Sequence, residues 1–293
     1  MKKFLLFFAI SLILTACNQK EVLFNPGDEG SFVFQTGAEF GSRPIEVFYH
    51  IPKGNVRSMD VMFVMHGTNR NGKDYFEWTK GAANKYSSVL LAPTFLSNLF
   101  PSRDYQSGGV MDQSGNFNAP EKMTYKLIDE IFEYLIKNSN LKTKHYNIIG
   151  HSAGGQFVHR FMQFSESPYV KIGVAGNSGY YTYPDETIEF AYGIAGYTSD
   201  SKAFRKRYYS RNLTILLGTA DTIRDSNFPS GPQADLQGLT RFERGQNFYN
   251  NNKKVAEAER AVFNWKMKFV EGIGHNGGVM MPEAVEFIYN NLR

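Results

Sequence analysis

The most informative pattern in this chain of 293 residues is the run Gly-His-Ser-Ala-Gly at residues 150–154. It fits G-x-S-x-G, in which small neighbours allow a serine to occupy a sharp turn between a strand and a helix. An apolar stretch at residues 146–149 leads into the run, and a segment with helical spacing follows it. A glycine-rich phosphate loop is the alternative, but the pattern G-x-x-x-x-G-K-S/T is lacking. The run therefore predicts that Ser152 is a nucleophile at the carboxyl edge of a sheet.

This motif, with its flanking strand and helix, resembles the α/β-hydrolase superfamily, and the resemblance covers roughly residues 45–292. Within the superfamily, His66-Gly67 after the third strand and the run Gly-His-Ser-Ala-Gly-Gly resemble single-domain esterases of the polyhydroxyalkanoate-depolymerase and feruloyl-esterase kind. The resemblance implies an α/β-hydrolase fold and a catalytic triad whose members follow the order serine, acid, histidine along the chain.

A serine hydroxyl is a poor nucleophile until a base accepts its proton, and in the superfamily order that base is a histidine after Ser152. His159 lies on the same expected helix, about 10 Å of axial rise away, so it is expected in the core or at the surface. His275 lies in the glycine-rich segment 272–278, directly after the last expected strand, where a flexible loop can bring its imidazole over the serine. We therefore predict His275 as the base. The other four histidines, expected at strand ends or turns, are His50, His66, His145 and His151.

The imidazole needs a buried carboxylate that holds one tautomer and stabilises the cation. Asp221 follows the apolar stretch 213–217 in Leu-Gly-Thr-Ala-Asp, which resembles the Gly-x-x-Asp turn where the superfamily keeps its acid. Asp225 is only four residues further on and stays open as the alternative. The remaining aspartates between Ser152 and His275 are Asp185, Asp200 and Asp235.

Acyl transfer also needs backbone donors for the oxygen that becomes negative. The amides of Ala153, next to the nucleophile, and of Thr68, in the loop after the third strand, are the expected oxyanion hole. Tyr180 and Tyr181 are predicted to bind substrate, because aromatic faces suit a sugar, an aryl acyl group or a polyester; core packing is the alternative. No cofactor or metal is expected, because no cluster has zinc spacing and the calcium-like loop at residues 112–116 has its glycine and glutamate misplaced.

The elements that must position these residues alternate along the chain. Apolar alternation predicts antiparallel strands at residues 31–35 and 45–51, and apolar runs predict buried strands between helices farther on. This alternation predicts a single α/β domain with a mostly parallel, twisted sheet and helices on both faces. The expected later strands are residues 60–66, 89–92, 146–149, 171–175, 213–217 and 264–270, and the main expected helices are residues 74–86, 121–138, 153–164 and 282–291.

The N-terminus resembles a bacterial lipoprotein signal peptide at residues 1–16. Lys2 and Lys3 precede an apolar stretch at residues 4–14, too short to span a bilayer, which needs about 20 residues. The following Leu-Thr-Ala-Cys resembles a lipobox, which implies lipidation of Cys17, the chain's single cysteine. We expect a tether at residues 17–30, a catalytic domain at residues 31–293, and a lipid-anchored protein of the bacterial cell envelope, on a membrane that the sequence leaves open.

The charge excludes nucleic acid as a partner. The net charge falls from +4 to +2 when Lys2 and Lys3 are removed with the signal peptide, and no basic block is long enough for a nucleic-acid tail. The densest basic segment, residues 202–211, is expected as a solvated helix face. The sequence thus predicts a serine hydrolase that cleaves carboxylic esters through an acyl-serine, on envelope-accessible glycan, aryl or polyester substrates. A serine peptidase on the same fold and a non-catalytic binding lipoprotein are the alternatives, and the ester and the oligomeric state stay open.

Overall fold

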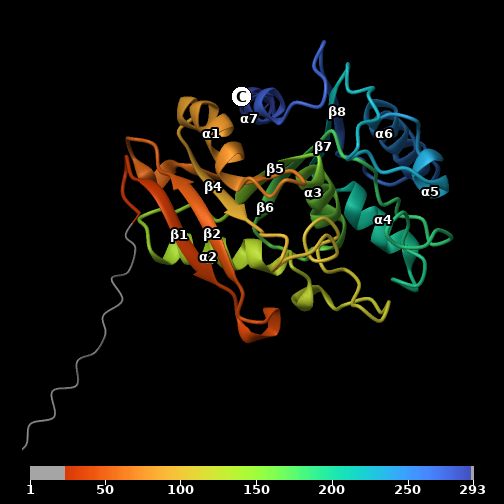
Figure 1. Cartoon of the computed structure of the whole chain (residues 1–293), viewed down its shortest axis with the longest axis horizontal. Helices are drawn as coiled ribbons and strands as arrows, with labels where there is room; N and C mark the ends of the chain where they lie inside the picture. The colour runs from red at the N-terminus through yellow and green to blue at the C-terminus, as the bar shows by residue number, and fades with distance from the viewer. Residues whose placement is uncertain (1–23, 292–293) are drawn as a thin grey trace, which may run out of the picture.

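A computed structural model describes residues 24–291 of the chain. An eight-stranded sheet runs through its centre in the order β1-β2-β4-β3-β5-β6-β7-β8 (Figure 1). Strands β1, β2 and β4 pair antiparallel, and every pairing from β4 through β3 to β8 is parallel. The strands are β1 Glu29–Gln35, β2 Pro44–His50, β3 Asp60–Met65, β4 Ser88–Thr94, β5 Tyr146–His151, β6 Val170–Gly176, β7 Leu213–Gly218 and β8 Lys266–Val270.

Helices cover both faces of the sheet. The helices α1 and α7 contact each other over one face, and α2, α3, α4 and α6 pack on the other (Figure 1). Successive residues of β3 point to opposite faces: Phe63 belongs to one apolar core, whereas Met62 and Val64 belong to the other. The predicted α/β-hydrolase fold is therefore confirmed. The helices are α1 Gly72–Lys85, α2 Lys126–Lys137, α3 Ala153–Phe164, α4 Ser201–Tyr209, α5 Pro232–Asp235, α6 Arg241–Ala258 and α7 Gly277–Asn291.

Two helix starts differ from the expectation. The expected helix at residues 121–138 begins only at Lys126, because Pro120–Lys122 forms a separate 3-10 turn. The last helix, expected at about residues 282–291, begins at Gly277 instead. Gly277 and Gly278 therefore form the first turn of α7, and the flexible segment expected around His275 is shorter than predicted.

The packed part of the chain includes residues that the sequence assigned to a tether. Phe24 is buried, with its ring edge-on to Phe32 and Tyr49, and its amide donates to the Asn138 carbonyl at 3.1 Å. The aromatic contacts make residue 24 part of the domain, earlier than the expected boundary at residue 31. The expected signal peptide and Cys17 lie outside the described residues. Between residues 24 and 291, no helix is long and apolar enough to cross a membrane.

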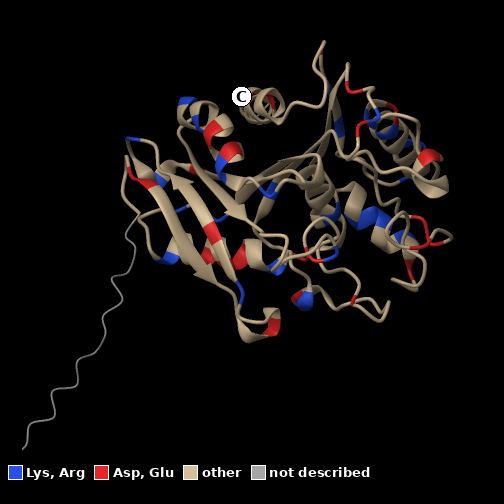
Figure 2. Cartoon of the chain, in the orientation of Figure 1, with Lys and Arg blue, Asp and Glu red and all other residues tan. Residues whose placement is uncertain are grey.

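Figure 2 shows basic residues along α4, and only some of them form a solvated face. Lys202 and Lys206 are exposed, as expected. Arg207 instead donates to the Gln163 and Ser165 carbonyls at the end of α3, and Arg211 donates to the Ser165 carbonyl at 2.7 Å. Arg205 pairs with Glu186 and Glu259. Cations near a helix C-terminus satisfy its last carbonyls, so this segment stabilises the end of the helix that follows Ser152.

Candidate active site

Ser152 stands between the last residue of β5 and the first residue of α3. Its backbone has φ 58° and ψ −116°, a strained conformation for a residue with a side chain, and its amide donates to the Gly176 carbonyl at 2.9 Å. A Cβ atom on Gly154 would lie 2.1 Å from the Met65 carbonyl oxygen, so only glycine allows α3 to start this close to β3. The G-x-S-x-G pattern thus folds into the strained turn that the sequence predicted.

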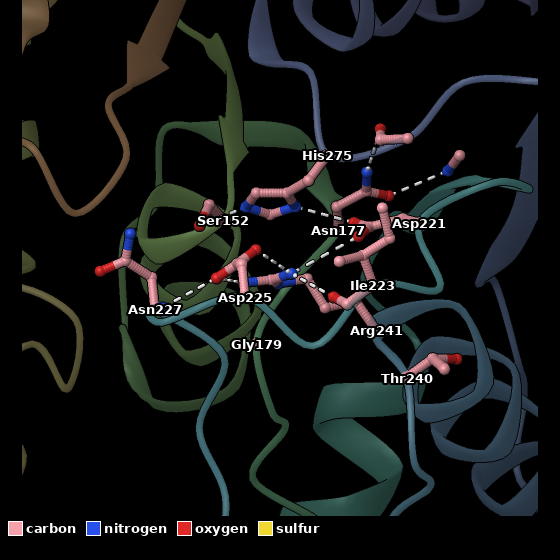
Figure 3. Close-up of polar contacts among 12 residues, drawn as sticks. Ser152, Asn177, Gly179, Asp221, Ile223, Asp225, Asn227, Thr240, Arg241 and His275 are labelled. Atoms are coloured by element: carbon pink, nitrogen blue, oxygen red, sulfur yellow. Dashed lines mark hydrogen bonds and ion pairs between the residues drawn. The ribbon is translucent and has the colours of Figure 1, made fainter.

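The imidazole of His275 lies between Ser152 and Asp221 (Figure 3). The distance from Nε2 to the Ser152 Oγ is 2.9 Å, and the distance from Nδ1 to the Asp221 Oδ2 is 2.7 Å. A carboxylate only accepts hydrogen bonds, so Nδ1 carries the proton and Nε2 is free to accept the serine proton. Asp221 exposes 1% of its side chain and His275 exposes 24%. The structure therefore brings all three predicted residues together in hydrogen-bonding distance.

Asp225, the alternative acid, pairs with a cation instead. Its two oxygens accept from Nη1 and Nη2 of Arg241 at 2.8 and 3.0 Å, and these bonds, against opposing burial, hold the pKa of Asp225 below its usual value. Arg241 is the first residue of α6, exposes 1% of its side chain, and also lies 3.5 Å from Asp221 (Figure 3). The geometry therefore favours Asp221 over Asp225 as the partner of the imidazole. No spacing rule in the sequence pointed to Arg241.

Asn177 is a second residue that sequence reasoning missed. It follows β6 directly and is buried, and its Oδ1 accepts from the Gly218 amide at 2.9 Å while its Nδ2 donates to the Gly274 carbonyl at 3.3 Å (Figure 3). One side chain thus ties the loop that carries Asp221 to the loop that carries His275. An asparagine directly after a buried strand at the carboxyl edge was the available signal.

The two expected oxyanion donors, Thr68 and Ala153, line one hollow together with Ser152. Ala153 opens α3, where backbone amides lack helical partners. The loop of Thr68 is held by the preceding His66, whose Nε2 accepts from the Phe95 amide at 3.0 Å and whose Nδ1 donates to the Gly67 carbonyl at 2.9 Å. Burial lowers the pKa of His66 to about 3, so this imidazole is a neutral support of the loop.

Ser152 lies between two hollows. The smaller, which we call the narrow cleft, has a volume of about 180 Å³, and the larger, the wide cleft, has about 360 Å³. Around Ser152 and Thr68, the narrow cleft is lined by uncharged residues including Asn69, Asn71, Tyr75, Trp78 and Asn227. The wide cleft, unlike the narrow one, also has arginines in its wall, and its lining includes Ser102, Arg103, Gln106, Gln156, Tyr180 and Arg241.

The two tyrosines predicted at the rim have different environments. Tyr180 lines the wide cleft, with the guanidinium carbon of Arg160 4.7 Å from its ring centre. Tyr181 is fully buried and stacks on Phe248 at 4.5 Å, so the expectation of a substrate contact is wrong for this residue. The two neighbours point to opposite sides of their segment, and only one side faces the cleft.

The remaining histidines have structural contacts. His159 is buried, with Nε2 accepting from the Thr182 amide at 3.1 Å. His151 is buried beside Tyr75. Burial lowers the pKa of both well below the ordinary value. His50, at the end of β2, lies near Glu29. Within residues 24–291, no three His, Cys, Asp or Glu side chains are placed to hold a metal ion.

Comparisons with known proteins place this geometry in context. No protein-family model matches the chain, and no curated protein matches it. Among solved structures, poly(aspartic acid) hydrolase-1 from Sphingomonas sp. KT-1 is 35% identical with a TM-score of 0.84, over 91% of this chain and 100% of that one. A poly(3-hydroxybutyrate) depolymerase from Bordetella parapertussis is 28% identical with a TM-score of 0.84, over 90% of each chain. An S-formylglutathione hydrolase from Staphylococcus aureus is 12% identical with a TM-score of 0.57, over 91% of this chain and 99% of that one, and shares the fold.

Proposed function

Because this chain belongs to the α/β-hydrolase superfamily of serine hydrolases, we propose that it cleaves carboxylic esters with Ser152 as nucleophile, His275 as base and Asp221 as acid. The observation that carries the proposal is the position of the His275 imidazole, 2.9 Å from the Ser152 hydroxyl and 2.7 Å from the Asp221 carboxylate. Three groups in this arrangement activate a serine for acyl transfer.

The proposed reaction has two halves. Ser152 Oγ attacks the ester carbonyl while its proton moves to Nε2 of His275, and the cation that forms is stabilised by Asp221. The amides of Thr68 and Ala153 donate to the oxyanion, a contribution of about 3–4 kcal/mol for one donor. Collapse expels the alcohol, which takes the proton from His275 and leaves an acyl-serine. A water molecule then gives a proton to His275 and attacks the acyl carbon of the acyl-serine. Collapse of this second intermediate releases the carboxylic acid and returns the proton from His275 to Ser152 Oγ.

The substrate is proposed to occupy the two clefts beside Ser152, with its acyl part on one side and its alcohol part on the other. The wide cleft, with Tyr180 at its wall and a volume of about 360 Å³, suits the bulkier part of a polyester, aryl or glycan ester. The depolymerase from Bordetella parapertussis, whose substrate is poly(3-hydroxybutyrate), supports the polyester class. The lipobox resemblance supports an envelope lipoprotein anchored through Cys17.

Amide cleavage is the second candidate. The Sphingomonas relative hydrolyses poly(aspartic acid), and the wide cleft of this chain carries Arg103. Its Nε lies 3.1 Å from Asp104, and its side chain is 36% exposed, which leaves part of the guanidinium open to a substrate carboxylate. A serine-dependent amidase would use the same three residues, with His275 giving its proton to the leaving amine. The non-catalytic alternative gains no support from the geometry, because a binding protein has no need of an imidazole between a serine and a carboxylate.

One experiment separates these possibilities. We expect the purified protein to hydrolyse short p-nitrophenyl esters and poly(3-hydroxybutyrate), with turnover reduced on the order of 10⁶-fold in Ser152→Ala, as in serine hydrolases where the triad acts as a unit. Poly(aspartic acid) is assayed in parallel, and its cleavage without ester cleavage would favour the amidase. A matched control is Ser167→Ala, a serine remote from both clefts whose hydroxyl donates to Asp129. Full activity of a folded Ser152→Ala variant would refute the mechanism.

A further inference from the structure

The Tyr75 hydroxyl lies where three segments of the active site meet. Tyr75 is a buried residue of α1, and its Oη is hydrogen-bonded to Nδ1 of His151 at 3.0 Å. A Cβ atom on Gly67 would lie 2.8 Å from the same Oη, and a Cβ on Gly277 would lie 3.0 Å from it. One hydroxyl therefore fits against the loop that precedes Thr68, the end of β5 before Ser152, and the start of α7 after His275.

His151 connects this hydroxyl to the proposed base. Its ring centre lies 4.4 Å from the ring centre of His275, with the two planes at 38°. His151 is almost fully buried, and in the described part of the chain its Nε2 has no hydrogen-bond partner. Burial, followed by the charges of His275 and Arg241, holds the pKa of His151 well below its usual value. His151 is therefore uncharged, and its ring packs against the ring of His275.

We infer that Tyr75 and His151 are positioning residues: Tyr75 fixes the ring of His151, and that ring sets the distance of His275 from the Ser152 hydroxyl. This inference rests on the proposed function, because it concerns the orientation of the proposed base. The 2.7 Å bond to Asp221 holds one edge of the His275 imidazole, and the contact with the His151 ring restricts how far the imidazole can turn about its side-chain torsions. A misplacement of about 1 Å is enough to lower turnover about 10²-fold.

Packing without a positioning role predicts a different result. Removing the Tyr75 hydroxyl changes side-chain volume very little, so a purely structural tyrosine would lose some stability and leave turnover intact. A positioning role predicts the reverse pattern. In Tyr75→Phe we expect kcat on a short p-nitrophenyl ester to fall about tenfold or more, with KM changed less than about twofold. The rate at which a fluorophosphonate labels Ser152 should fall in parallel, because labelling also needs a correctly placed His275.

The matched control is Tyr209→Phe. Tyr209 is also buried, and its Oη is hydrogen-bonded to Asn252 at 3.0 Å, away from both clefts. The two variants remove the same atom, so we expect similar losses of thermal stability and a fall in kcat for Tyr75→Phe alone. A kcat within twofold of the wild type in Tyr75→Phe would overturn the inference.

A double variant tests whether Tyr75 acts through His151. In a His151→Asn background, which itself lowers kcat, Tyr75→Phe should cause little further loss, because coupled residues are not additive. Additive losses of kcat in the double variant would overturn the inference. If Tyr75→Phe does not fold, His151→Asn alone is the test, and full turnover of that variant would overturn the inference. Failure of the proposed function gives a different result, because the wild-type protein itself would not hydrolyse esters. The rates of fluorophosphonate labelling of Ser152 in Tyr75→Phe and in Tyr209→Phe would still test the positioning role.

Discussion

Replacing Asp221 by asparagine should remove catalysis while leaving the packing of the site almost unchanged. The carboxylate is 99% buried and accepts from Nδ1 of His275 at 2.7 Å. An asparagine amide group in this place favours the tautomer whose proton is on Nε2, and that nitrogen can then no longer accept the Ser152 proton. The corresponding change in another serine hydrolase triad lowers kcat about 10⁴-fold, which corresponds to roughly 5.4 kcal/mol of activation free energy.

Asp225→Asn is the matched control, because it makes the same chemical change four residues away. Asp225 exposes 37% of its side chain and binds Arg241, so kcat should change less than about tenfold. Thermal stability should fall, because the buried Arg241 loses its two shortest carboxylate contacts. The assay is kcat on a short p-nitrophenyl ester, with unfolding temperature measured in parallel. A loss near 10⁴-fold in Asp225→Asn with turnover preserved in Asp221→Asn would show that the acid has been assigned to the wrong residue.

Two further predictions concern stability and substrate binding. His66, His151 and His159 are neutral when folded, because burial lowers the pKa of each, to about 3 for His66. Unfolded histidines take up protons below about pH 6.5, so the free energy of unfolding should decrease as the pH falls below that value, by about 1.4 kcal/mol per pH unit for each histidine. Urea unfolding at pH 7, 6 and 5 measures this, and a constant free energy would contradict it. Tyr180→Ala should raise KM several-fold with little loss of stability, whereas Tyr181→Ala should destabilise the protein by about 3–5 kcal/mol; equal urea midpoints for the two variants would contradict their different placement.

The fold was predictable because its signals are local in the sequence. Residues 61–65 are apolar on both faces of a strand, and the residues of α3 follow a helical period directly after a turn that only small neighbours permit. Parallel strands bring their carboxyl ends to one edge, so residues after β5, β7 and β8 were expected to meet there. Ser152, Asp221 and His275 occupy those positions, and the structure places them within hydrogen-bonding distance.

Other parts of the site depend on contacts that no local pattern encodes. Tyr75 lies on α1 and reaches the site only because α1 packs beside α7, over a hundred and ninety residues later in the chain. Which of Tyr180 and Tyr181 faces the cleft depends on which of them packs on Phe248, and that contact is made by Tyr181. Helix α7 starts at Gly277, before the expected residue 282, and Gly277 lies against the Tyr75 hydroxyl, where a larger residue would crowd it.

The two neighbouring aspartates are best understood through the cation between them. Arg241 is buried, and a guanidinium in that position needs a carboxylate partner. If Asp221 were its only partner, the strongest bonds of Arg241 would compete with those of His275 for the same two oxygens. Asp225 accepts both short bonds of Arg241, at 2.8 and 3.0 Å, and leaves Asp221 with a longer contact of 3.5 Å on Oδ1. Oδ2 of Asp221 therefore stays available to the imidazole, so the second aspartate supports the proposed acid by neutralising the charge beside it.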